Sequence, residues 1–420
     1  MSSGSDYQSD SSYDYQRNTL SFLEDQEWPG TVLVSLLQDL EDTLHPNTQE
    51  TVQSKLALGR EWRRLYTDTV LLRCLKLLKE KSSIGKSENA QSNDEWERAI
   101  RLLDQAIILA GAPGEGRLEL TLSCISFIQR WYLPLVIDIS TPHRVLSQQP
   151  TLSLGTDLVP TITPPPSLSA FPARAQRPFV LPGFASSWPA TTNWKSKSYL
   201  VSCAGRGRIV PVERGGDYRT DDWSVELVPW SDFLDKIGWG EEVDDTEQLY
   251  LAQHSLFTQF PKLRADIQVP DYVYAEPESH PCYVGPPGNN EQLVINACPN
   301  NTPSVQIVGF KIIWLAPPEA SSGMYAFNPI SKPSHEGDTP TEPSRDPKRE
   351  GMMGNTSSID VFALSVSTTH DPSYPLFFSH TLPMAQSVVL SPGDALIIPP
   401  GWWHAMRGVG GNSFSVSFWF

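Results

Sequence analysis

One histidine near the C-terminus is placed where a side chain could do chemistry. His404 follows a tight turn, Ser391–Asp394, a short apolar strand, Ala395–Ile398, and a strand breaker, Pro399–Gly401. An imidazole in such a place can bind a metal ion or carry a proton. The closing run Ser413–Phe420 mostly alternates serine with phenylalanine or valine, which is the period-2 pattern of a strand with one face in a core. We therefore expect His404 to be aimed into a β-barrel.

This C-terminal pattern resembles the second half of a JmjC domain, the cupin-type barrel of iron(II)- and 2-oxoglutarate-dependent oxygenases. Further segments match in family order and extend the resemblance upstream to about Arg177: Arg177–Phe184, Ser187–Ala190, Val210–Glu213, Tyr218–Ser224, Tyr250–Phe257, Ile267–Tyr272 and Gly309–Pro317. The resemblance implies an α+β protein in which an α-helical N-terminal domain precedes a JmjC/cupin double-stranded β-helix barrel. Val210–Glu213 and Leu251–His254 most resemble small JmjC proteins that hydroxylate protein side chains, some of which have been proposed to be histone lysine demethylases.

The resemblance also implies two cofactors and one metal ligand. Non-haem oxygenases hold iron(II) with two histidines and one carboxylate on one face of the metal. In JmjC domains the first two ligands form a His-x-Asp or His-x-Glu pair just after a strand like Leu293–Ala297, and His404 matches the third ligand. The implied reaction couples decarboxylation of 2-oxoglutarate to hydroxylation of a protein side chain or demethylation of a methyl-lysine.

Residues that would hold 2-oxoglutarate are present in the sequence. Lys311 matches the family lysine that pairs with the distal carboxylate, and its apolar flanks favour a buried strand over a surface lysine on an edge strand. Tyr218 matches a family tyrosine whose hydroxyl binds the same carboxylate. Asn301 is a candidate co-substrate asparagine, although counting back from Lys311 places Thr302 at the family position.

The first two iron ligands have no counterpart. Only Cys298–Ser304 separates the Leu293–Ala297 strand from the next family strand, and no His-x-Asp or His-x-Glu occurs anywhere in the chain. His370 adjoins Asp371, but neighbouring residues on a strand point to opposite faces. His254 and His280 are better explained as solvated or hydrogen-bonded structural histidines. The sequence therefore predicts an iron site with one of its three ligands.

Two interpretations remain open. In the first, the chain is an oxygenase whose sequence lacks an internal piece that carries the metal pair. In the second, the loss is real and the protein is a non-catalytic binding module that uses the barrel groove and the helical domain. Loss of a barrel strand would open a sheet edge, which favours the first interpretation. So does the persistence of His404, Lys311 and Tyr218.

Composition limits the class of partner. The chain has 32 Lys and Arg residues against 48 Asp and Glu residues, a net charge of −16, which is a poor match for nucleic acid and a better one for basic proteins such as histone tails or ribosomal proteins. An acidic protein without a basic partner fits the charge equally well. Five scattered cysteines predict neither a zinc site nor a disulfide framework. No export signal or membrane span is expected, and the family implies the nucleus or the cytoplasm.

Composition also divides the chain. We expect a disordered tail at 1–18, an α-helical domain at 19–140, a Pro-rich linker at 141–176 and the JmjC domain at 177–420, with a flexible insertion at 328–355. Two apolar stripes at helical spacing support the helical domain: Leu71, Leu75 and Leu78, and Trp96, Ile100, Leu103 and Ile107.

The first interpretation predicts that the transcript contains an extra in-frame piece between Ala297 and Val305. About a dozen codons would encode the missing barrel strand with its turn and an His-x-Asp. Drift would have eroded the flanking strands together with the site, yet both flanks remain good family strands. Full-length transcript sequencing checks this. If every transcript reads directly from Ala297 through Cys298 to Val305, the non-catalytic interpretation becomes the better one.

Overall fold

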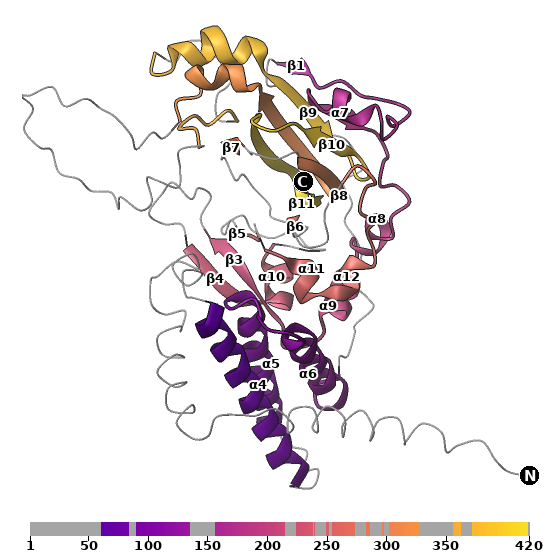
Figure 1. The fold of residues 1–420 in the computed structure, drawn as a ribbon, viewed down its shortest axis with the longest axis vertical. Helices are drawn as coiled ribbons and strands as arrows, with labels where there is room; N and C mark the ends of the chain where they lie inside the picture. The colour runs from indigo at the N-terminus through magenta and orange to yellow at the C-terminus, as the bar shows by residue number, and fades with distance from the viewer. Residues whose placement is uncertain are drawn as a thin grey trace, which may run out of the picture. The chain divides into compact units, whose positions relative to one another are not determined.

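A computed structural model describes residues 60–83, 90–134, 156–214, 224–237, 239, 249–251, 254–273, 283–285, 296–297, 302–326, 356–362 and 372–418 (Figure 1). The chain divides into two compact units, Met1–Val136 with Gly205–Val210, and Ile137–Ala204 with Pro211–Phe420. The expected tail at 1–18 and the expected insertion at 328–355 lie outside the described residues.

The first unit is helical, as the apolar stripes predict. Its helices are α4 (Arg60–Ser83), α5 (Ala90–Ile108) and α6 (Arg117–Trp131). All residues of both predicted stripes are buried, and all of them except Leu75 belong to one core cluster. Trp96 stacks on Tyr132 with 4.0 Å between ring centroids, which joins α5 to the end of α6. Burial of these stripes, rather than helix propensity alone, stabilises helices of this length.

The segment Gly205–Val210 belongs to the helical unit although it lies far from the helices in sequence. Arg208 Nη2 lies 2.7 Å from Asp104 Oδ1, and the backbone N–H of Ile209 donates to Asp104 Oδ2 at 2.9 Å. The two charged side chains are 5% and 0% exposed. A buried charge is strongly destabilising when its partner is removed, so this ion pair fixes the segment to α5.

The second unit contains a curled mixed sheet. Its strands are β1 (Asp157–Leu158), β2 (Phe179–Leu181), β6 (Tyr283–Gly285), β7 (Asn296–Ala297), β8 (Thr302–Ala316), β9 (Gln386–Leu390), β10 (Ala395–Ile398) and β11 (Trp403–Ser417). A smaller sheet has the order β4-β3-β5, with β3 (Ile209–Arg214), β4 (Ser224–Pro229) and β5 (Leu249–Tyr250). Short helices accompany the sheets: α7 (Phe171–Arg174), α8 (Ala190–Asn193), α9 (Lys197–Ala204), α10 (Trp230–Lys236), α11 (Leu256–Gln259) and α12 (Pro261–Arg264). The whole chain is thus α+β with a cupin-like barrel, as expected.

Strand β8 is the centre of the larger sheet. Its first part, Thr302–Val305, pairs with β10, its second part, Lys311–Leu315, pairs with β9, and β11 runs along most of the strand. Gly309, between the two parts, has φ 70°, and the register with β11 shifts between Val409 and Phe414. A left-handed residue inside a strand marks a bulge, a position that favours glycine. The bulge lets one continuous strand bend around the barrel.

Strand β10 is an inner strand of the larger sheet. This strand has β2 on one edge and the first part of β8 on the other. Both edges of β10 are therefore paired with neighbouring strands.

The expected Pro-rich linker is shorter than its composition suggests. Within it, Asp157–Leu158 pairs with β9, Thr161 forms a bridge to Val180, and Phe171–Arg174 is a helical turn. Proline is compatible with each setting, because β1 is a two-residue strand at the sheet edge and Pro172 lies in the first turn of α7. Residues 156–176 are therefore part of the barrel domain.

Replacing the buried carboxylate of the helical unit tests that unit. Asp104→Ala should lower the free energy of unfolding by about 3–5 kcal/mol, because Arg208 would remain buried and uncompensated. Urea unfolding followed by circular dichroism measures the loss. Glu97→Ala is the matched control, since the partner of Glu97, Arg206, is 42% exposed and such pairs contribute about 0–1 kcal/mol. Small, equal losses in both variants would contradict the assigned role of Asp104.

Candidate functional site

The predicted turn before His404 is present and is held by Asp394. The backbone N–H of Ser391 donates to Asp394 Oδ2 at 3.0 Å, and that of Gly183 donates to Oδ1 at 2.9 Å. Gly393 has φ 94°, a conformation that favours glycine in a tight turn. The Asp394 carboxylate thus joins the turn to the chain just after β2. This link fixes the position at which β10, and after it β11, begins.

His404 lies at the start of β11 between two neighbouring strands. It pairs with Leu315 of β8 on one side and with Asn296 of β7 on the other. Its Nδ1 lies 3.2 Å from the carbonyl oxygen of Trp402. When the ring proton is on Nδ1, the Nδ1–H donates a hydrogen bond to that carbonyl, and the Nε2 lone pair is available to a metal. Burial lowers the pKa of the His404 imidazole, against a smaller opposing effect of the Trp402 carbonyl, so the ring is neutral at neutral pH.

Lys311 is a buried cation in the middle of β8. Its side chain is 8% exposed, which excludes the alternative of a surface lysine on an edge strand. Its Nζ donates to Ser415 Oγ at 2.5 Å, and no acidic side chain forms an ion pair with it among the residues that the structure describes. Desolvation lowers the pKa of Lys311 to about 8. A buried ammonium with only a hydroxyl partner is well suited to bind an anion.

The serine face of the closing strand is also buried, which the alternating pattern did not predict. Phe414 packs on Trp194 with 4.7 Å between ring centroids, as expected for a core face. Ser413 and Ser415, on the opposite face, are each 4% exposed. Gln306 Nε2 donates to Ser413 Oγ at 2.9 Å and to the carbonyl of Gly309 at 3.1 Å. The serines therefore line the interior beside the bulge.

Two buried polar atoms in the first part of β8 have no hydrogen-bond partner in the described part of the chain, Ser304 Oγ and Gln306 Oε1. Both residues are at most 1% exposed. Buried polar atoms are rarely left unpaired in folded proteins, so these two mark a place where a polar ligand could be accommodated. Sequence reasoning missed both residues, because a lone serine or glutamine in an apolar strand has no motif.

Lys311 and His404 face the same side of the sheet. Lys311 and Leu315 are four residues apart on one strand, and Leu315 is directly opposite His404, so all three side chains leave one face. Four residues of strand span roughly 13 Å, so the backbones of Lys311 and His404 are well separated. The tertiary structure thus brings two of the predicted site residues to one interior surface.

The described residues do not make an iron site. They contain no cluster of three or more histidine, cysteine, aspartate or glutamate side chains that could hold a metal ion. His254 Nε2 lies 2.7 Å from Gln259 Oε1, in agreement with a structural role. Other candidate positions lie outside the described residues: Tyr218, His280, Cys298, Asn301, His370 and Asp371. A single imidazole does not fit iron(II), which this family holds by three side chains.

Strand β7, which precedes the short junction, ends beside His404. Ala297, the last residue of β7, pairs with Trp403, and Asn296 pairs with His404 itself. Residues inserted after Ala297 would therefore begin next to the one imidazole that matches a ligand. By contrast, the buried Lys311 ammonium, which donates to Ser415 Oγ, is chemically suited to the distal carboxylate of 2-oxoglutarate.

Comparisons with known proteins agree with this architecture. A model of the cupin-like domain family matches residues 168–420. The chain is 29% identical over 385 residues to lysine-specific demethylase 8 of Danio rerio, covering 86% of this chain and 82% of that protein. It is 34% identical over 266 residues to Jumonji C domain-containing protein 5 of Drosophila melanogaster, with 61% and 58% covered. It is 33% identical over 246 residues to lysine-specific demethylase JMJ30 of Arabidopsis thaliana, with 58% and 49% covered.

These matches define a protein with a cupin-like domain, and the chain belongs to the JmjC family. The matched regions span about half the length of two of these relatives. Among the helices that the structure describes, none is long and apolar enough to cross a membrane.

Removing the buried ammonium tests the environment of Lys311. The folded-state pKa of about 8 lies below that of an unfolded lysine, so wild-type stability should rise with pH between about 8 and 10.5 and then level off. Lys311→Met should remove this rise and stabilise the fold at pH 7 by on the order of 2–3 kcal/mol, since one pKa unit corresponds to about 1.4 kcal/mol. Urea unfolding at several pH values measures both. Identical pH profiles in the two proteins would contradict the burial of this charge.

Proposed function

We propose that the 420-residue chain is a JmjC protein that binds 2-oxoglutarate through Lys311 but does not turn it over by itself. The observation that carries the proposal is the buried Lys311 ammonium, which has Ser415 Oγ as a hydrogen-bond partner and no ion-pair partner in the described part of the chain. A buried cation is costly without an anion, and a dicarboxylate supplies one.

Each interior residue has a defined part in this binding. The Lys311 ammonium pairs with the distal carboxylate, and Ser415 Oγ orients the ammonium by accepting a hydrogen bond from it. Ser304 offers a hydroxyl, while Gln306 fixes the bulge at Gly309 from which Lys311 follows. An iron ion held by a complete set of ligands would couple the oxidation of 2-oxoglutarate by O2, which gives succinate and CO2, to hydroxylation of a protein side chain or demethylation of a methyl-lysine. In this chain the described donors leave the iron face incomplete, so no step of that reaction is assigned to it.

A longer form of the protein is the second candidate, as an active side-chain hydroxylase or lysine demethylase. It is favoured by the pairing of Ala297 with Trp403, which would deliver an inserted His-x-Asp next to His404. The pairing of β10 on both edges favours the other possibility, a chain that folds without the insertion and acts as a binding module. The net charge of −16 supports a basic protein as partner in either case, and relatives named as lysine demethylases are consistent with a location in the nucleus or the cytoplasm.

Titration calorimetry with 2-oxoglutarate tests the proposal. The wild-type chain should bind it, and Lys311→Met should weaken binding by at least about tenfold through loss of a charge-assisted interaction. Because only the ammonium form pairs with a carboxylate, affinity should fall about tenfold per pH unit above about pH 8. With iron(II) and ascorbate, the same protein should form no succinate above background, since one imidazole cannot hold the metal.

Lys262→Met is the matched control, because Lys262 is exposed on α12 and the change in charge is the same. It should bind 2-oxoglutarate as the wild type does. Equal affinity of Lys311→Met and the wild type for 2-oxoglutarate would contradict the assignment of the anion site to Lys311. Turnover that is abolished by His404→Ala would show that residues outside the described part complete the iron face.

A further inference from the structure

Strand β11 loses its regular pairing with β8 around Phe414. The register shifts between Val409 and Phe414, and it shifts again between Phe414 and Ser415. Such irregularities leave residues unpaired and interrupt the ladder of backbone hydrogen bonds. Backbone pairing therefore holds β11 less firmly at Phe414 than elsewhere along the strand, and the packing of the Phe414 side chain gains importance.

Two tryptophans pack against Phe414 in the core. The rings of Trp194 and Phe414 are tilted, with 4.7 Å between their centroids, and Trp239 meets Phe414 edge-on at 6.3 Å. Trp194 and Phe414 are both fully buried. Because a close-packed core leaves little room for adjustment, the place of the Trp194 indole decides where Phe414 can lie.

A buried carboxylate, that of Asp266, holds Trp194. Asp266 Oδ2 accepts hydrogen bonds from Trp194 Nε1 at 2.8 Å and from the Tyr199 hydroxyl at 2.7 Å. Asp266 Oδ1 accepts from Asn193 Nδ2 at 3.3 Å, and the backbone carbonyl accepts from the N–H of Ala190 at 3.1 Å. Asp266 is 6% exposed. A buried carboxylate is costly unless hydrogen bonds satisfy it, so these donors are kept close around it.

The opposite face of β11 carries the hydrogen-bond partner of Lys311. Phe414 and Ser415 are neighbours on the strand, so their side chains leave opposite faces. Ser415 Oγ accepts a hydrogen bond from Lys311 Nζ at 2.5 Å. A displacement of Phe414 therefore moves the hydroxyl that orients the buried ammonium. Contacts thus run without a break from Asp266 through Trp194 to Lys311.

We propose that Asp266 is a positioning residue for the anion site at Lys311. By holding the Trp194 indole against Phe414, it sets the place of the Ser415 hydroxyl and so the direction of the Lys311 ammonium. An ammonium that is already oriented loses less conformational freedom when an anion binds, which favours affinity. The inference rests on the proposed function, because it assigns a residue that keeps the proposed 2-oxoglutarate site in order without touching the ligand.

A purely structural role for Asp266 is the competing explanation. In that case the carboxylate joins α8 and α9 to the chain after α12, and Lys311 is indifferent to it. Both explanations expect a less stable protein when Asp266 is replaced, because three donors lose their shared acceptor. They differ in the affinity for 2-oxoglutarate and in the pKa of Lys311, which a structural role alone would leave unchanged.

Asp266→Asn tests the inference in the full chain, under conditions where circular dichroism shows the variant to be folded. The amide brings a donor of its own among the donors around position 266, so the hold on Trp194 is loosened. Titration calorimetry should show 2-oxoglutarate binding weakened by about three- to tenfold. A displaced Ser415 hydroxyl also stabilises the ammonium less, which lowers the pKa of Lys311 below about 8. The pH above which affinity declines should therefore move down.

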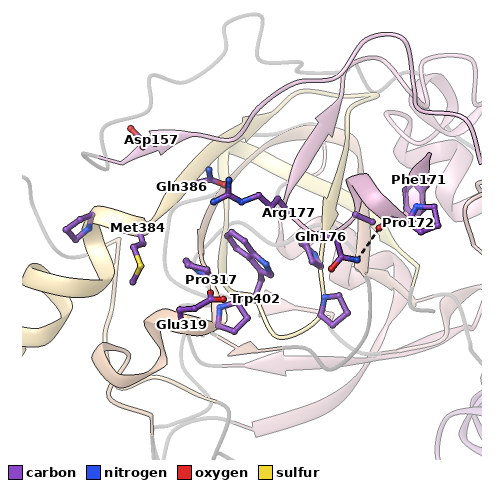
Figure 2. Close-up of a pocket in the computed structure, with 15 residues that line it drawn as sticks. Asp157, Phe171, Pro172, Gln176, Arg177, Pro317, Glu319, Met384, Gln386 and Trp402 are labelled. Carbon is purple, nitrogen blue, oxygen red and sulfur yellow. Dashed lines mark hydrogen bonds between the residues drawn. The ribbon is translucent and has the colours of Figure 1, made fainter. Parts of the chain in front are cut away.

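Two matched controls separate the route through Trp194 from other effects. Tyr199→Phe removes a hydrogen bond to the same carboxylate oxygen, but no ring contact joins Tyr199 to Phe414 in the described part of the chain. Glu319→Gln makes the same carboxylate-to-amide change at an exposed position, in the wall of the cavity of about 970 Å³ shown in Figure 2. Each control should alter 2-oxoglutarate affinity by less than about twofold.

Trp194→Phe tests the next link of the contact chain. It keeps an aromatic ring beside Phe414 while it removes the N–H that Asp266 accepts. The variant should reproduce the weaker binding of Asp266→Asn, and the two changes together should weaken binding no more than the larger single effect, because both act on one contact. If Asp266→Asn is too unstable to titrate, Trp194→Phe by itself decides the question.

Three results would overturn the inference. The first is a folded Asp266→Asn protein with wild-type affinity and an unchanged pH dependence, since Asp266 would then be structural only. The second is an equal loss of affinity in Tyr199→Phe, which would reduce the effect to general destabilisation. The third is additive weakening by Asp266→Asn and Trp194→Phe, which would show that Asp266 does not act through the indole.

A measurement without ligand keeps this inference apart from the proposed function. Wild-type stability in urea should rise with pH above about 8, and in Asp266→Asn the rise should begin at a lower pH, because the folded-state pKa of Lys311 is lower still. A shifted profile in a protein whose wild type binds no 2-oxoglutarate would refute the proposed function and support the positioning role. Equal 2-oxoglutarate binding by the wild type and Asp266→Asn, with identical profiles, would do the reverse.

Discussion

The pairing of β8 with three other strands is the constraint on which the barrel depends. This 15-residue strand meets β10 with its first part, β9 with its second part and β11 along most of its length. Every interior residue discussed here is on β8 or is held in register by it. A shift of one residue would turn Lys311 toward the outside and bring Trp314, which packs in a separate core, to the inside. Register, set by the bulge at Gly309, therefore decides whether a site exists at all.

Inside the barrel, apolar and polar surfaces are sorted along the strands. One core cluster packs Ile313 and Leu315 against Leu396 and Ile398 of β10. Nearer to the bulge, the same face of the sheet carries polar residues that are also buried: Lys311, Gln306 and the serines. A low-dielectric wall on one side of an ammonium strengthens its attraction for an anion and keeps water from competing. The proposed anion site therefore depends on how the strand is packed as much as on the lysine itself.

The described barrel strands pair without the expected metal pair. β10 is paired on both edges, with β2 on one side and the first part of β8 on the other. Hydrogen-bond pairing between strands depends on backbone groups and tolerates many sequences, whereas an octahedral metal face requires particular side chains at particular positions. A fold of this kind can therefore outlast its metal site.

The sequence by itself determined the family, the helical unit, the turn before His404 and the candidate roles of His404 and Lys311. These follow from local patterns, because apolar periodicity, turn residues and motif spacing act within a few residues of one another. Only the tertiary structure decided that Lys311 is buried without an ion-pair partner in the described part of the chain, that the serine face of β11 is interior, and that Asp104 pairs with Arg208. A cavity lined by residues as distant in sequence as Asp157 and Trp402 also appears only in three dimensions. Burial and long-range register depend on which strands become neighbours, and no local pattern carries that information.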